Sequence, residues 1–150
     1  AIKADVNAAT TTRTACFYAR GALELAVSWL YPNDATLKLP YQDNLSALIQ
    51  EPTFKLAAGN AVFAKTVLIT RLGNQAVHSH RAVTQFDALT AVRELFHFCF
   101  WLARTYACGA KPADSLAFNP NGGDSNFGTA NIISDGIGRR RLQLGAKIIF

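Results

Sequence analysis

TQFDALTAVRELFHFCFWLARTYAC, from Thr84 to Cys108, is the stretch that decides the predicted fold. Its apolar residues recur at helical spacing and continue around most of the circumference, which is typical of a helix packed on several sides. Thr84 and Asp87 are spaced as a capping box, with Asp in place of the usual Glu or Gln. Gly109 and Pro112 end the pattern. The sequence therefore predicts one long, central helix.

Two further helices are predicted at the start of the chain. The first runs from Asp5, as its N-cap, to Tyr31, which Pro32 follows. A short second helix is expected to be capped by Asp43, to have Leu45, Leu48 and Ile49 on one apolar face, and to be closed by Pro52.

A third helix is predicted between these two and the central one. Thr53–Gly59 is expected to be a connector of at most one turn, and Asn60 is expected to cap the helix. Gly73 lies inside the helical pattern, where Gly costs roughly 1 kcal/mol relative to Ala, so it indicates a close helix contact or a bend. The predicted apolar stripe is Phe63, Val67, Leu68, Leu72, Ala76 and Val77.

The composition changes after Pro112. Residues 119–128 are rich in Gly, Asn, Asp and Ser, which is typical of a loop or linker, and residues 142–150 alternate with the period of a β-strand. We therefore predict an all-α bundle of about four helices in residues 1–112, followed in residues 113–150 by a linker and a nonhelical tail that ends in one strand.

Length, composition and charge limit the possible functions. The chain has 150 residues, half of them hydrophobic, which suffices for one domain with a core. It contains no Met, so we expect a processed piece of a longer protein. Its three cysteines have no zinc or redox spacing and are expected to be buried thiols of a cytoplasmic protein. The net charge of +5 permits contact with phosphate backbones without requiring it.

The candidate site is RLGNQAVHSHR, from Arg71 to Arg81. Arg71 and His78 are seven residues apart, so they share a helix face and are displaced by roughly 10 Å along the axis. Arg71 as a charged fork and His78 as an acid or base could converge on one phosphate and cleave RNA. Asn74, close to the same face, could orient either side chain.

A purely structural role is the alternative for this motif. Arg71 would then pair with an acidic residue of another helix, while Asn74 and His78 satisfy each other or a helix end in the core. His78 and His80 form a weaker metal signal, because no further ligand stands at a suitable spacing. We therefore expect no metal site and no cofactor.

Other chemistry is weakly represented. The sequence has no phosphate-binding loop, dinucleotide fingerprint, nucleophile elbow or zinc spacing. The one basic run is Arg139, Arg140 and Arg141, a weak candidate for nucleic-acid binding.

Several segments resemble a known family: ARGALELAVSWLY, LPYQDNLSALI, RLGNQAVHSHR, FDALTAVRELFHFCFWLARTYA and GAKPADSLAFNP. They are similar to the N-terminal domain of the R subunit of type I restriction enzymes, the subunit that translocates and cleaves DNA. The similarity covers residues 5 to about 120. In that family the motor and nuclease motifs lie in later domains, and none of their residues is present in this chain.

Arg71 followed by Gly73, Asn74, Ala76 and His78 also resembles the motif of the HEPN group of small helical domains, some of which are ribonucleases. Six residues, 72–77, separate the Arg from the His here. The position after the Arg is usually polar in those ribonucleases, whereas this chain has Leu72.

The tail resembles a different family. From Asn121, NGGDSNFGTANIISDGIGRRRLQLGAKIIF is similar to the closing strand of an outer-membrane TonB-dependent receptor, which alternates and ends on a terminal Phe. We therefore interpret the chain as a chimera joined at about Pro120.

The function expected from these resemblances is a noncatalytic recognition or assembly module of a type I restriction R subunit. Its partners would be other subunits, later domains of the parent chain, DNA or RNA, with no membrane contact for residues 1–112. The alternative is a metal-independent HEPN ribonuclease that uses Arg71 and His78 across a homodimer. Both functions imply a cytoplasmic protein.

Overall fold

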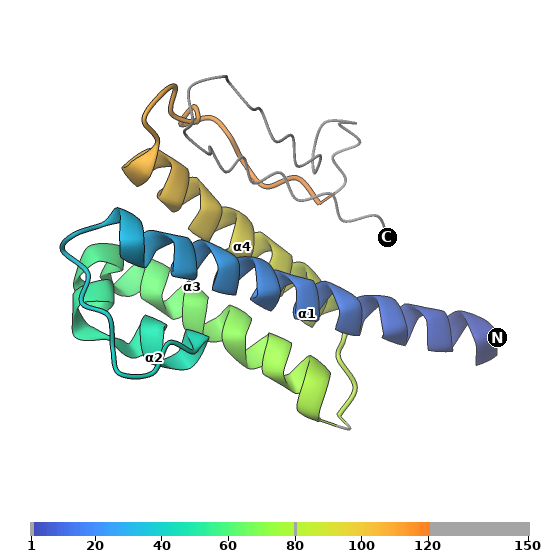
Figure 1. Cartoon of the computed structure of the whole chain (residues 1–150). Coiled ribbons are helices and arrows are strands. Elements are labelled where there is room, and N and C mark those ends of the chain that lie inside the picture. The colour runs from blue at the N-terminus through green and yellow to red at the C-terminus, as the bar shows by residue number, and fades with distance from the viewer. Residues whose placement is uncertain (1, 80, 121–150) are drawn as a thin grey trace, which may run out of the picture. The chain divides into compact units, whose positions relative to one another are not determined.

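Four helices form the part of the protein that the computed structural model describes, residues 2–79 and 81–120 (Figure 1). Within these ranges there is no strand, so the prediction of an all-α bundle of about four helices is confirmed. The predicted strand at 142–150, like everything else from residue 121 onward, lies outside the described residues. The helices are α1 (Ile2–Asn33), α2 (Leu45–Gln50), α3 (Pro52–His78) and α4 (Gln85–Tyr106).

α1 begins before the residue expected to cap it. Asp5 lies inside the helix, so its assignment as N-cap is wrong, because no helix breaker precedes it. The helix ends one residue past Pro32, and the Asn33 side-chain amide donates to the Trp29 carbonyl at 2.6 Å. Small and branched side chains recur at helical spacing on its buried face, which lets other helices approach closely. They are Ala15, Cys16, Ala19, Leu23, Ala26, Val27 and Leu30.

α2 is a short helix that covers one end of the bundle. Its N-cap is Asn44, whose side chain accepts from the Ala47 amide at 3.0 Å, and not the predicted Asp43. The Tyr31 hydroxyl donates to the Leu48 carbonyl at 2.7 Å, which fastens α2 to α1. The predicted apolar face is confirmed, because Leu45, Leu48 and Ile49 are all buried.

α3 contains a kink where a loop was expected. Residues 53–58 are helical, so a connector of at most one turn is wrong, and the helical geometry breaks only at Gly59. Glu51 caps the start of the helix through the Thr53 and Phe54 amides, and Pro52 suits the first helical position. Gly59 has φ 72° and ψ 166°, a conformation open to Gly and strained for residues with a Cβ.

Gly59→Ala should therefore destabilise the fold by about 2 kcal/mol, although no heavy atom lies within 4 Å of the added Cβ. The penalty comes from the backbone conformation alone. Chemical denaturation monitored by circular dichroism would measure it. Because its ψ of 166° lies far from the αL region that Asn tolerates, Gly59→Asn should lose about as much stability as Gly59→Ala; unchanged stability in both variants would contradict a conformational cause.

The predicted capping box at the start of α4 is confirmed. Thr84 Oγ1 accepts from the Asp87 amide at 3.1 Å, and Asp87 Oδ2 accepts from the Thr84 amide at 3.0 Å. The helix ends at Tyr106, two residues before Cys108. Among the described helices it packs against α1 and α3, whereas α1 and α3 each contact all three others. The prediction that this helix is central is therefore wrong, and α1 and α3 hold that position.

The core lies between α1, α3 and α4, with Phe54 and Phe98 as its largest fully buried side chains. The predicted stripe of α3 is partly wrong, because Val67 and Val77 are 37% and 49% exposed. The actual buried face of the helix after the kink runs through Thr66, Ile69, Thr70, Leu72, Gly73 and Ala76.

The segment after α4 packs back onto that helix. Arg104 forms an ion pair with Asp114 and donates to the Pro112 carbonyl at 3.3 Å. The ring of Phe118 lies 5.8 Å from that of Phe96. Ala1–Phe118 accordingly forms one compact unit, whereas the change in composition suggested a boundary after residue 112.

Candidate functional site

The motif from Arg71 to Arg81 divides its residues between two faces of α3. Arg71, Asn74 and His78 are exposed, whereas Leu72, Gly73 and Ala76 are buried. The structural alternative for the three polar residues is therefore wrong, since none of them is buried in the core. Within the described residues, no ion pair involves Arg71.

Gly73 lies where α3 closely approaches α1. A Cβ at this position would lie 2.4 Å from the Arg20 Cβ and 2.7 Å from the Arg20 Cδ. A side chain on residue 73 would thus overlap the stem of Arg20. The predicted close helix contact is found at Gly73, while the bend in α3 occurs at Gly59.

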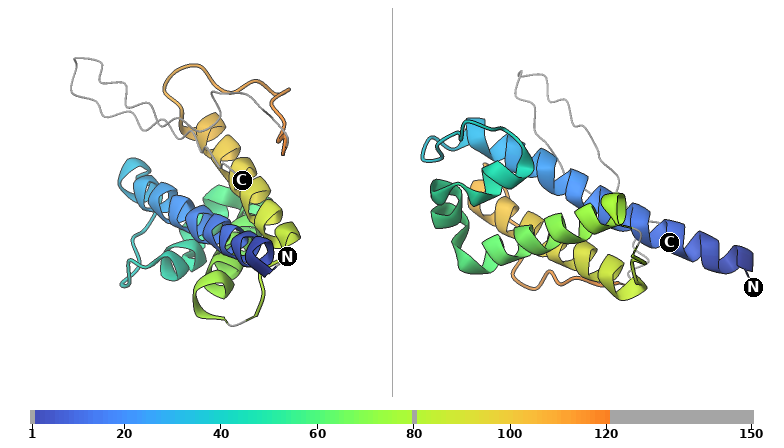
Figure 2. Two further views of the ribbon diagram at one scale, coloured as in Figure 1. Left: turned by 90° about the vertical axis from the view of Figure 1, so that its right-hand side faces the viewer. Right: turned by 90° about the horizontal axis from the view of Figure 1, so that it is seen from below.

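Arg13 of α1 holds the end of the motif in place. Its guanidinium donates to the carbonyls of Ala76, Ser79 and Arg81 at 2.8, 3.1 and 2.9 Å. The first two carbonyls lie at the C-terminal end of α3, where a positive charge also complements the helix dipole. Figure 2 shows the turn between α3 and α4 beside α1, as these contacts require.

Arg13 was missed in the sequence analysis, although a signal for it exists. It is the sole charged residue between Asp5 and Arg20, in a stretch of otherwise uncharged side chains. An isolated charge there needs a specific partner when the helix packs. The sequence did not show that this partner is a helix end more than sixty residues away.

Arg13→Ala should lower the free energy of unfolding by about 2 kcal/mol, because three carbonyls of a helix end and its loop lose a charged donor. Arg13→Lys should recover only part of the loss, since an ammonium cannot reproduce a planar fork that reaches three carbonyls. Urea denaturation of both variants provides the measurement. Full recovery in Arg13→Lys would show that charge alone, without the fork, stabilises this end of α3.

An open hollow of about 340 Å³ lies between the last turns of α3 and the start of α4. Arg71 and Arg81 line it from two different elements, and Asp87 contributes the one carboxylate on its walls. Asp87 Oδ2 is already engaged by the backbone amide and hydroxyl of Thr84. His78 does not line this hollow, so the structure does not bring Arg71 and His78 together in it. The remaining lining residues are Leu72, Gln75, Ala82 and Thr84.

Other candidates from the sequence are placed as follows. His80 and Arg139, Arg140 and Arg141 lie outside the described residues. Among residues 2–79 and 81–120, no three His, Cys, Asp or Glu side chains group as metal ligands. The expectation of three buried thiols is wrong for Cys108, which is exposed, while Cys16 is buried and Cys99 partly so.

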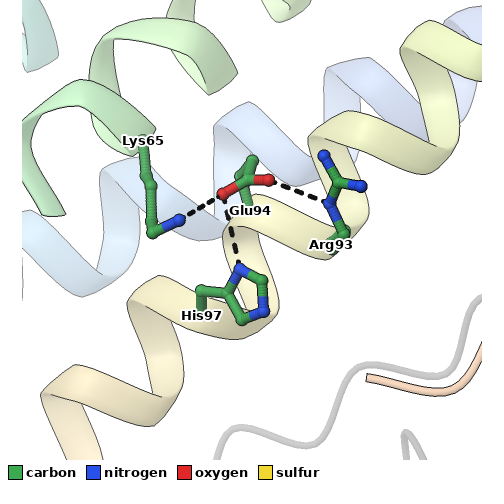
Figure 3. A network of polar contacts seen from close by, with 4 residues as sticks. All are labelled: Lys65, Arg93, Glu94 and His97. Atoms are coloured by element: carbon green, nitrogen blue, oxygen red, sulfur yellow. Dashed lines mark hydrogen bonds and ion pairs between the residues drawn. The ribbon is translucent and has the colours of Figure 1, made fainter. Parts of the chain in front are cut away.

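A second polar cluster joins α3 to α4 around Glu94, which is only 7% exposed (Figure 3). Lys65 Nζ donates to its Oε2 at 2.6 Å and Arg93 Nε donates to its Oε1 at 2.9 Å. His97 Nδ1 lies 3.4 Å from Oε2. Burial acts to raise the pKa of this carboxyl, but the hydrogen bonds from Lys65, Arg93 and His97 outweigh it and lower the pKa from 4.5 to about 2.

The Glu94 cluster is built for structure more than for proton transfer. A carboxyl with a pKa of about 2 stays ionised near neutral pH and is a poor general acid or base. Its two oxygens are occupied by three side chains from two helices. The cluster was not predicted, because a single Glu in an apolar helix gave no indication of its partners.

Comparisons of the chain with protein-family models, with curated proteins and with solved structures found no match. Among the described helices, none has both the length and the apolar character needed to cross a bilayer.

Proposed function

We propose that this helical domain is a noncatalytic recognition and assembly module of a type I restriction R subunit, contacting other subunits or DNA. The resemblance in five ungapped segments supports this role, and a cytoplasmic location accompanies it. The arrangement around Arg71 supports the noncatalytic part of the proposal.

The observation that carries the proposal is the composition of the hollow. It contains two arginines and one carboxylate, and it leaves His78 outside. Cleavage of RNA needs a group that removes a proton from the 2′-hydroxyl and another that protonates the leaving oxygen. Arginine does neither near neutral pH, and Asp87 is engaged in capping α4. The hollow is thus suited to binding an anion and poorly suited to acid–base chemistry.

A nuclease assay on labelled single-stranded RNA and duplex DNA tests this proposal. The chain should leave both substrates intact without ATP. Arg71→Ala and His78→Ala, whose side chains are exposed, should keep the parent's circular dichroism and unfold within about 0.5 kcal/mol of it. Hydrolysis of RNA that both folded variants lose would overturn the noncatalytic role.

A HEPN-type ribonuclease is the second candidate function. One observation favours it: Arg71, Asn74 and His78 are all exposed on α3, so a substrate or a second copy of the chain can reach them. In this hypothesis the partner copy completes a site that the hollow alone lacks. This hypothesis requires that RNA is cleaved and that the rate rises with the concentration of dimer. If the domain is only a recognition module, it should remain a monomer and cleave no RNA at any protein concentration.

A further inference from the structure

The hollow beside α4 has the donors of an anion site and no anionic partner for them. Within the described residues, neither Arg71 nor Arg81 forms an ion pair, and both side chains are exposed. Two arginines and one Asp give the hollow a formal charge of +1. Arg13, whose guanidinium contacts the Arg81 carbonyl, adds a further positive charge at this end of the bundle.

The charges of the bundle are unevenly distributed. The end that holds the turn between α3 and α4 carries Arg13, Arg71 and Arg81 against Asp87. At the opposite end, around the close of α1, α2 and the end of α4, four carboxylates stand beside four cations, so the charges cancel. The carboxylates are Asp34, Asp43, Glu51 and Asp114, and the cations are Lys38, Lys55, Arg104 and Lys111. An approaching polyanion is therefore attracted more strongly to the first end.

We propose that this hollow binds a phosphate group of a nucleic-acid backbone through Arg71 and Arg81. A planar carboxylate is satisfied by one guanidinium fork, whereas the tetrahedral oxygens of a phosphate accept from two forks that approach from different elements. Arg71 comes from α3 and Arg81 from the following loop, so they meet this requirement. Gln75 donates to the Ala82 carbonyl at 3.5 Å and keeps its second N–H for the ligand.

The size and openness of the hollow indicate that the phosphate belongs to a nucleic-acid strand and not to a small molecule. Its volume of about 340 Å³ is near the lower limit for small-molecule sites, which span roughly 300–1,000 Å³. Its apolar lining is confined to Leu72 and Ala82, too little to hold a nucleobase tightly. Phosphate contacts made by one open hollow contribute most when other phosphates of the same strand contact the protein nearby. The inference rests on the proposed recognition role in taking nucleic acid as the partner.

The test compares two double variants of the full 150-residue chain. Arg71→Gln with Arg81→Gln removes both donors, whose side chains make no ion pair in the described structure. Lys38→Gln with Lys111→Gln removes two exposed charges away from the hollow and is the matched control. Fluorescence anisotropy with labelled duplex DNA at several salt concentrations gives the affinity, and circular dichroism checks the fold.

Loss of both arginines should weaken DNA binding about tenfold and reduce the magnitude of the negative slope of log K against log salt by about 2. The control should retain the parent's slope. In a second arm, inorganic phosphate is compared with NaCl of equal ionic strength, and it should raise the Tm of the parent and the control but not of the arginine variant.

The two arms separate failure of the site from failure of the role. DNA binding that is equal in both double variants would overturn the site and leave the recognition role standing. Arginine-dependent stabilisation by inorganic phosphate without DNA binding by the parent would support the phosphate site and overturn nucleic acid as its source. If the parent neither bound DNA nor was stabilised by phosphate, both the site and nucleic acid as the partner of this domain would be overturned.

Discussion

Replacing Gly73 with Ala should lower the free energy of unfolding by about 2 kcal/mol, although Ala is the better helix former. The new Cβ would lie 2.4 Å from the Arg20 Cβ, an atom fixed to the α1 backbone. Rotating the Arg20 side chain cannot relieve that overlap, so α1 and α3 must move apart. Their separation would also loosen neighbouring core contacts, because the interior is closely packed.

Gly21→Ala is the matched control, since Gly21 lies in α1 one residue after Arg20 and has no heavy atom within 4 Å of an added Cβ. This substitution should raise stability by about 0.5–1 kcal/mol through helix propensity and loss of unfolded-state freedom. Urea unfolding of both variants should therefore give changes of opposite sign. A stable Gly73→Ala protein would contradict the close contact between the helices.

The contact at Gly73 also affects the candidate site. Arg13 and Arg20 lie two turns apart on α1, and Gly73 and Ala76 lie one turn apart on α3. Close approach at Gly73 brings the end of α3 within reach of the Arg13 guanidinium. Gly73→Ala should thus weaken these hydrogen bonds as well and alter the loop that carries Arg81.

Helix type and number were predictable, because they depend on local patterns. The capping box of Thr84 and Asp87 fixed the start of α4, and apolar spacing identified each helix. The helices that α4 contacts were not predictable. Its sequence is apolar around most of the helix circumference, so the pattern does not indicate which face packs against which helix. Gly59 was misjudged for a related reason: a Gly after a short helical turn ends a helix or bends it, and the sequence does not distinguish the two outcomes.

The candidate site was predictable in part. Periodicity placed Arg71, Asn74 and His78 on one face of a helix, and the structure shows all three exposed. Helical periodicity could not show that Arg81 joins Arg71 in the hollow, because the position of Arg81 depends on the course of the loop between α3 and α4. Long-range partners such as Arg13 with Ala76 were beyond local patterns for the same reason.

The buried carboxylate of Glu94 should make stability depend on pH in acid. Its pKa is about 2 in the folded protein and about 4.5 when the chain is unfolded. Because the folded value is the lower one, this stabilisation is complete above about pH 4.5. It is lost as the pH falls towards 2. Part of the Coulombic gain is screened, since Arg93 and His97 are 47% and 40% exposed.

Glu94→Gln should lower the free energy of unfolding at pH 7 by about 2 kcal/mol, because Lys65 and Arg93 lose the charge that pairs them across α3 and α4. The same variant should lose much of the parent's pH dependence between pH 4.5 and 2. Urea unfolding at a series of pH values measures both effects.

Glu24→Gln is the control for these measurements. It removes the partly buried pair of Arg20 and Glu24 within α1 and leaves Glu94 in place. Because the Glu94 cluster stays intact, this variant should keep the loss of stability between pH 4.5 and 2 that Glu94 causes. If Glu94→Gln kept the parent's slope below pH 4.5, the carboxylate would have to titrate normally in the folded protein. The four-residue cluster would then contribute little to the contact between α3 and α4.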